Sequence, residues 1–300
     1  MALANDSKWR SAATMVFDRP IDARRNVAMF GVATYQTSVS PRSSTSTPDA
    51  IRAALHRYST WSWASRVDLA DYVAVVDHGD VTDPDGDGAR ERLAAMLEEV
   101  DTPLAMFLGG DNAATWHALG AFAGEQLDQF GLITLDAHLD MRDGRSNGSP
   151  VRQLLDEGLD ARHVVQVGLG EYSNSAAYAR DSLKRGVRII ERDAFHREDA
   201  TVIARRALEV ARQGGRQVYV DIDLDVADRS VVPGCPASAP GGLSADEVRR
   251  FVRELTSSKH VVAIDFTEVD VDQDAPDQRT VRLAALLVLE ALAGVQRRTL

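Results

Sequence analysis

Short apolar runs alternate with helix-like segments along most of this 300-residue chain. The runs have the length of buried strands, and strands separated by helices form right-handed βαβ units. The alternation therefore predicts an α/β fold in which a mostly parallel sheet is covered by helices on both faces. The expected strands are residues 26–31, 73–76, 104–108, 132–135, 164–168, 188–190, 218–223 and 261–266, and the expected helices are residues 89–99, 112–123, 201–213, 245–255 and 280–294.

The two ends of the chain differ in composition. Residues 1–25 are polar and lack a periodic apolar pattern, so we expect a loose or peripheral N-terminal arm there. A first helix is expected to open at Asp49, a candidate N-cap residue that follows Pro48. The last expected helix is apolar nearly all round, which predicts burial in the domain or at a subunit contact. No repeat or linker divides the rest, so residues 26–300 are expected to form one domain.

The charge balance excludes some classes of partner. The chain has 45 acidic and 34 basic side chains, which argues against a general nucleic-acid surface. No run of about 18 uninterrupted apolar residues is present, so no membrane span is expected. The first residues lack the apolar core of a signal peptide, and the one cysteine, Cys235, cannot form a disulfide within the chain. Both features favour a cytoplasmic protein.

Polar side chains follow four of the expected strands at the point where each strand ends. In a parallel open sheet, ligands bind beyond the carboxyl ends of the strands, so these side chains are expected to meet at one edge. They are Asn112 after the strand 104–108, Asp136, His138 and Asp140 after 132–135, Asp221, Asp223 and Asp225 at the end of 218–223, and Asp265 and Glu268 at the end of 261–266.

So many carboxylates in one place favour a bound cation, because like charges in a partly buried site repel one another. Asp136, His138 and Asp140 alternate along an extended segment, so their side chains point to one side. Oxygen ligands with a single imidazole suit Mn²⁺ better than a thiolate-type zinc site, and five strong ligands favour a pair of ions. Asp221 is a weaker candidate because it lies inside the strand. Taken singly, each of these groups could have a structural role instead of binding a metal: a helix cap, a surface turn or a hydrogen-bonded loop histidine.

Five motifs together resemble the ureohydrolase superfamily, which contains arginase, agmatinase and formimidoylglutamase. They are GGDN at 109–112, DAHLD at 136–140, DIDLDVAD at 221–228, PGCPASAPGGLS at 233–244 and TEVD at 267–270. The resemblance implies a three-layer αβα fold around a parallel sheet, a binuclear Mn²⁺ centre, a small-molecule substrate and a homo-oligomer, commonly a trimer or a hexamer.

The resemblance also implies a role for each motif residue. Asp136 and Asp223 would bridge two Mn²⁺ ions, Asn112 and Asp140 would bind the first ion, and His138 and Asp225 would bind the second. Glu268 would pair with the cationic amidine or guanidine group of the substrate. Asn112 departs from the family, which usually has histidine there. An amide oxygen is a weaker ligand than imidazole for Mn²⁺, so the first site is expected to be weakened.

Two features favour formimidoylglutamase within the superfamily. Asn147 stands where arginases and agmatinases carry a histidine, and DAHLDMR, with Arg142, is similar to the DAHFDLR of formimidoylglutamases. The implied reaction converts N-formimino-L-glutamate to L-glutamate and formamide, a step of histidine degradation. The ions would lower the pKa of a bridging water, and Asp140 could hand the proton to the leaving nitrogen. Arginine forks recognise carboxylates, which makes the loop after the metal motif the candidate substrate-binding segment. Its candidate residues, with Glu268, are Arg142, Arg145, Asn147, Ser149 and Arg152.

Two other functions remain open. A guanidino hydrolase of the agmatinase, guanidinobutyrase or arginase type would release urea. A catalytically silent member would bind a ligand without turnover, and Asn112 is the feature that favours it. Each arginine of the loop could equally belong to a surface ion pair.

Overall fold

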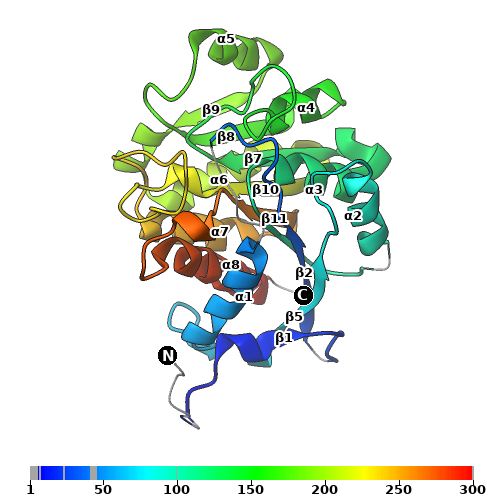
Figure 1. The fold of residues 1–300 in the computed structure, drawn as a ribbon, viewed down its shortest axis with the longest axis vertical. Helices are drawn as coiled ribbons and strands as arrows, with labels where there is room; N and C mark the ends of the chain where they lie inside the picture. The colour runs from blue at the N-terminus through cyan, green and yellow to red at the C-terminus, as the bar shows by residue number, and fades with distance from the viewer. Residues whose placement is uncertain (1–5, 7, 23, 41–45, 99, 299–300) are drawn as a thin grey trace.

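A nine-stranded sheet forms the centre of the protein (Figure 1). The computed structural model describes residues 6, 8–22, 24–40, 46–98 and 100–298. In these residues the strand order is β1-β5-β2-β6-β11-β10-β7-β8-β9, and every pairing is parallel. The strands are β1 (Val16–Phe17), β2 (Arg25–Val32), β5 (Val73–Asp80), β6 (Ala105–Gly109), β7 (Phe130–Leu135), β8 (Val164–Leu169), β9 (Arg188–Glu191), β10 (Gln217–Asp223) and β11 (Val261–Thr267). A separate antiparallel pair joins β3 (Trp61–Ser62) to β4 (Val67–Asp68).

Helices cover both faces of the sheet, which confirms the predicted three-layer α/β fold (Figure 1). Two apolar clusters, one for each face, hold the layers together. The first includes side chains of α1 (Thr47–Ala54), α6 (Ala200–Ala211), α7 (Ala245–Thr256) and α8 (Arg279–Arg297). The second includes side chains of α2 (Ala89–Leu97), α3 (Ala113–Ala123), α4 (Pro150–Asp156) and α5 (Ala176–Arg185).

The central strands are apolar because both of their faces are covered. All residues of β6 and β7 are buried, as expected of a parallel sheet between two helical layers. The last helix, α8, is buried along most of its length and packs against α1 and α7, so its apolar sequence is used within the domain. Among the described residues, no helix combines the length and apolar character that crossing a membrane requires.

The structure differs from the expectations at several elements. Ala12 and Met15, expected in a loose arm, are buried, and β1 pairs with β5 at the edge of the sheet. Helix α1 begins at Thr47, so Asp49 lies in its first turn and not at the N-cap, because proline is well tolerated at the first helical positions. The short helices α4 and α5 and the β3–β4 pair were not predicted. The sequence also predicts a polar loop at residues 38–48, and residues 41–45 of that loop lie outside the described residues.

Candidate metal centre

The four central strands β6, β11, β10 and β7 are neighbours in the sheet although they are far apart in the sequence. Their carboxyl ends therefore meet at one edge, as the sequence predicts for parallel strands. Asp111 and Asn112 follow β6, Asp136 to Asp140 follow β7, Asp223 ends β10, and Glu268 follows β11.

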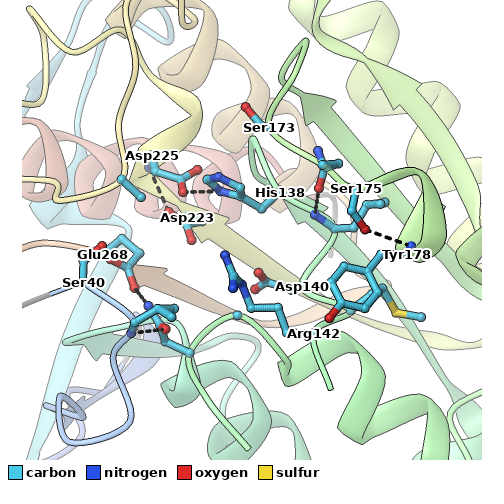
Figure 2. Close-up of a pocket in the computed structure, with 17 residues that line it drawn as sticks. Ser40, His138, Asp140, Arg142, Ser173, Ser175, Tyr178, Asp223, Asp225 and Glu268 are labelled. Atoms are coloured by element: carbon cyan, nitrogen blue, oxygen red, sulfur yellow. Dashed lines mark hydrogen bonds and ion pairs between the residues drawn. The ribbon is translucent and has the colours of Figure 1, made fainter. Parts of the chain in front are cut away.

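Two groups of side chains at this edge have the geometry of a metal site. In the first, one ligand atom each from Asp136, His138 and Asp225 lies within 4.8 Å of the others. In the second, the same holds for Asp136, Asp140 and Asp223. The His138 Nδ1 atom lies 2.6 Å from Asp225 Oδ2 (Figure 2). Because Asp136 belongs to both groups, the geometry is that of two adjacent cation sites with a shared carboxylate.

Backbone N–H groups orient the carboxylates. Asp136 Oδ1 accepts from the N–H of His138 at 2.6 Å, and Asp223 Oδ1 accepts from the N–H of Asp225 at 2.8 Å. Asp225 Oδ1 accepts from the N–H of Ala137 at 3.1 Å, which links the ends of β7 and β10. These bonds occupy one oxygen of each carboxylate and restrict the orientation of the group.

The negative charges of the cluster favour a bound cation. Burial and the neighbouring carboxylates raise the pKa values of Asp136 and Asp223, and burial raises the pKa of Asp140 to about 7. Burial opposes the charged form of His138, but the hydrogen bond and charge of Asp225 outweigh it and raise the pKa of His138 to about 9. The buried Asp136 Oδ2 atom has no hydrogen-bond donor among the described residues. A divalent cation would satisfy this oxygen and remove the repulsion, so the residues fit a metal.

Asn112 contacts the cluster as a hydrogen-bond donor. Its Nδ2 donates to Asp140 Oδ2 at 2.6 Å, and its Oδ1 accepts from the hydroxyls of Thr115 at 2.9 Å and Thr267 at 2.7 Å. The sequence predicts an oxygen ligand at this position, whereas this arrangement turns the amide oxygen away from Asp140. The orientation of the amide follows from its hydrogen-bond network.

Glu268 lies next to the cluster and lines the same pocket. Its Oε1 accepts from the N–H of Asn112 and from Asn147 Nδ2, both at 2.9 Å. Asn147 Oδ1 in turn accepts from the N–H of Val39 at 2.9 Å, which fixes that segment to the pocket. Glu268 and Asp140 both have left-handed backbone conformations, with φ of 60° and 51°. Residues other than glycine rarely adopt this backbone conformation unless their surroundings enforce it.

A cavity of about 280 Å³ opens in front of the cluster (Figure 2). Arg142 lines it beside Asp140, and no carboxylate of the described chain lies within ion-pair distance of the Arg142 guanidinium. The arginine approaches the chain at Gly148, where a Cβ atom would lie 2.7 Å from Arg142 Cδ. The lining residues are Val39, Ser40, His138, Leu139, Asp140, Met141, Arg142, Asn147, Gly148, Ser173, Asn174, Ser175, Tyr178, Asp223, Asp225, Ala237 and Glu268.

Three of the predicted substrate-binding residues do not line this cavity. Arg145 has its guanidinium carbon 4.6 Å from the ring centre of Trp116 and lines a different cavity. Arg152 donates to the carbonyl of Met141 at 2.8 Å and forms ion pairs with two aspartates. Ser149 is fully buried, and its hydroxyl donates to the carbonyl of Ser146. Their partners are structural, so Arg142, Asn147 and Glu268 are the predicted residues that remain candidates for substrate contact.

Sequence reasoning missed one wall of the cavity. Ser173, Asn174, Ser175 and Tyr178 lie between β8 and the first turns of α5 and line the pocket. The signal was present, because this segment also follows the carboxyl end of an expected strand. The rule that located the other four groups would have found it.

Asp221 belongs to neither metal group, in agreement with the doubt raised by its place inside a strand. It is buried in β10 and pairs in register with Asp265 of β11. Asp265 accepts from the hydroxyl of Tyr219 at 2.6 Å and from Thr115 at 2.8 Å, and burial raises its pKa to about 6.

A comparison with protein families decides the relationship. The model of the arginase family matches residues 25–294. The chain belongs to the arginase family. Among members of this family, it is 32% identical over 288 residues to the formimidoylglutamase of Halalkalibacterium halodurans, covering 92% of this chain and 89% of that protein.

Solved structures of related enzymes share the arginase-family fold of this chain. The formimidoylglutamase of Bacillus subtilis superposes with a TM-score of 0.89 at 29% identity, covering 100% of this chain and 96% of that chain. The proclavaminate amidino hydrolase of Streptomyces clavuligerus superposes with a TM-score of 0.82 at 26% identity, covering 98% of this chain and 99% of that chain.

Proposed function

We propose that this arginase-family protein is a manganese-dependent hydrolase that cleaves N-formimino-L-glutamate into L-glutamate and formamide. One observation carries the proposal: members of both carboxylate-rich groups, Glu268 and Arg142 line a single cavity. The substrate has matching charges, since it carries one cationic amidine and two carboxylates. Similarity to formimidoylglutamases over most of the chain supports the same reaction.

The metal residues in this proposal are those of the two groups described above. Asp136, His138 and Asp225 would hold one Mn²⁺ ion, and Asp136, Asp140 and Asp223 would hold the other. When bound, the ions supply a nucleophile at neutral pH and positive charge that stabilises the transition state. Mostly oxygen donors with one imidazole suit Mn²⁺, as the sequence predicts.

The chain's own groups orient the substrate and move protons. Glu268 would accept hydrogen bonds from the amidine, and the N–H of Asn112 and the amide of Asn147 hold its carboxylate in place. Arg142 would form a charge-assisted pair with a substrate carboxylate. Asp140, which receives a hydrogen bond from Asn112, is the carboxyl group that would give a proton to the leaving nitrogen.

Location and assembly complete the proposal. We propose that the enzyme acts in the cytoplasm, where a chain with one cysteine needs no disulfide, and that it is a homo-oligomer, a trimer or a hexamer, on the basis of the family resemblance. Its mass of 32.7 kDa per chain makes sedimentation a direct test, since a trimer is about 98 kDa and a monomer would contradict the proposal.

The test of the activity is turnover on a panel of substrates. The purified chain is incubated with Mn²⁺ and either N-formimino-L-glutamate, arginine, agmatine or 4-guanidinobutyrate, and release of glutamate and of urea is measured with and without chelator. Glutamate release from the first compound alone, lost on chelation, is the expected result. Urea from a guanidino compound would move the protein to the guanidino hydrolases. No turnover on any compound would favour a ligand-binding member.

A further inference from the structure

The segment Ala137, His138 and Leu139 determines where the one imidazole of the cluster lies. His138 faces Asp225 through Nδ1, the ring nitrogen nearer to the backbone. Three bonds separate Nδ1 from the Cα atom, so a shift of the backbone displaces Nδ1 by almost the same amount. The position of this ligand therefore depends on what holds the segment.

Asn174 holds the segment on both sides of His138. Its Oδ1 accepts from the N–H of Leu139 at 2.8 Å, and its Nδ2 donates to the carbonyl of Ala137 at 3.1 Å. The two bonds bracket the histidine and use both ends of one planar amide, which defines the position and the orientation of the segment. They are contacts between a side chain and the backbone, so they depend on the identity of residue 174.

Asn174, whose two hydrogen bonds clamp the segment, is itself held in place by its surroundings. Asn174 lies in the turn between β8 and α5, next to Ser175, whose hydroxyl caps α5 by accepting from the N–H of Tyr178. The backbone N–H of Gly170 in the same turn also donates to the carbonyl of Ala137, at 2.9 Å. Figure 2 shows the side chains of Ser173 and Ser175 on the same side of the pocket as His138. Asn174 therefore connects the segment that carries His138 to a turn that is held by the capped end of α5.

A second side chain supports the far end of the segment. Gln166 of β8 donates from Nε2 to the carbonyl of Leu139 at 2.5 Å, and its Oε1 accepts from the hydroxyl of Ser182. Leu139 is 2% exposed, so its N–H group loses a needed partner if Asn174 is removed, because water does not replace it easily.

We propose that Asn174 is a positioning residue that sets the affinity of the metal site containing His138. The inference rests on the proposed function, because it takes the cluster to bind Mn²⁺. It assigns Asn174 to the metal centre although its side chain donates to and accepts from backbone groups and not from the ligands themselves. Contacts that orient a ligand in this way are worth about 10- to 100-fold in metal affinity.

The experiment measures Mn²⁺ binding directly. Titration calorimetry and metal analysis after dialysis give the stoichiometry and the dissociation constants of the wild-type chain and of Asn174→Ala. We expect two ions in the wild type, and in the variant one site weakened about 10- to 100-fold while the other changes little. The electron paramagnetic resonance signal of a coupled Mn²⁺ pair should give way to that of uncoupled Mn²⁺ at the same metal concentration.

Two further variants keep the test decisive. Ser173→Ala changes the neighbouring residue of the same turn and should leave both dissociation constants unchanged. Gln166→Met removes the other side-chain contact to the segment at nearly constant volume, and it should weaken the same site if Asn174→Ala does not fold. Thermal unfolding of the metal-free variants identifies a general loss of stability.

The possible results separate the inference from the function on which it rests. A wild-type chain that binds no Mn²⁺ would overturn the proposed function and, with it, the inference. A wild-type chain that binds two ions, together with a folded Asn174→Ala that binds both as tightly, would overturn the inference alone. Equal weakening by Ser173→Ala would also overturn it, since the effect would then belong to the turn as a whole.

Discussion

Gly148 gives a direct test of whether Arg142 binds the substrate. A Cβ atom at position 148 would lie 2.7 Å from Arg142 Cδ and 3.0 Å from Nε. Carbon atoms in contact are roughly 3.5–4.0 Å apart, so Gly148→Ala should displace the arginine side chain by about 1 Å. The clash is with a flexible side chain, and the chain is therefore expected to fold normally.

The expected cost follows from the lost contact. A displacement of about 1 Å lengthens a hydrogen bond beyond its useful range, and a hydrogen bond to a charged group contributes roughly 1.5–3 kcal/mol. At 1.36 kcal/mol per factor of ten, Gly148→Ala should lower kcat/KM for N-formimino-L-glutamate by about 10- to 150-fold. Most of the change should be in KM, because the carboxylate end is bound equally in the ground state and the transition state.

Steady-state kinetics of glutamate release, with bound Mn²⁺ and thermal midpoint measured on the same samples, is the assay. Arg142→Ala alone should show a loss of similar size, and the double variant should be little worse than either single variant, because both remove the same contact. Additive losses, or a wild-type KM in Gly148→Ala, would refute the reasoning and exclude Arg142 as the carboxylate-binding group.

Four other perturbations have defined outcomes. Glu268→Ala should leave both Mn²⁺ ions bound, since Glu268 is in neither metal group, but lower kcat/KM by at least about 10²-fold; retained activity would remove it from the site. Asn112→His should tighten the Mn²⁺ site near Asp140 by offering an imidazole, and calorimetry showing equal or weaker binding would contradict this. Removal of Mn²⁺ by chelation should lower the thermal midpoint, because an ion at 100 times its dissociation constant stabilises the folded state by about 2.7 kcal/mol. Burial and nearby arginines hold the pKa of His117 at about 4, so the unfolded chain binds the extra proton between about pH 6.5 and pH 4. The free energy of unfolding should therefore fall as the pH is lowered from about 6.5 to about 4. In urea titrations it should fall by up to about 3 kcal/mol more in the wild type than in His117→Gln. Equal slopes against pH in the two proteins would be inconsistent with a neutral buried His117.

Much of the site could be predicted because parallel strands bring their carboxyl ends to one edge of the sheet, and this does not depend on the conformations of the loops. The apolar runs before Asp136 and Asp223 are long enough to be recognised, and the alternation of Asp136, His138 and Asp140 is visible in one short segment. Burial of the last helix was also readable from its composition. These features depend on local sequence and on one general rule of sheet topology.

The contacts that distinguish one polar residue from another could not be predicted. Arg142 and Arg152 are ten residues apart in one polar stretch of the sequence, yet Arg142 lines the cavity, whereas Arg152 lies in α4 and pairs with Asp181. The orientation of the Asn112 amide depends on Thr115 and Thr267, which lie in a helix and a strand of different parts of the chain. Such choices are made by tertiary packing, and a linear pattern contains no information on it.

The left-handed backbone at Asp140 and Glu268 has a consequence for engineering. For a residue other than glycine this conformation costs about 1–2 kcal/mol, so glycine at either position would relieve a steric penalty. A selection for heat resistance alone would favour that change and would erase the pocket's chemistry. A library of variants selected for both heat resistance and turnover should instead keep Asp140 and Glu268 while other positions change. The protein would then retain a less stable backbone at these two positions because activity requires their side chains.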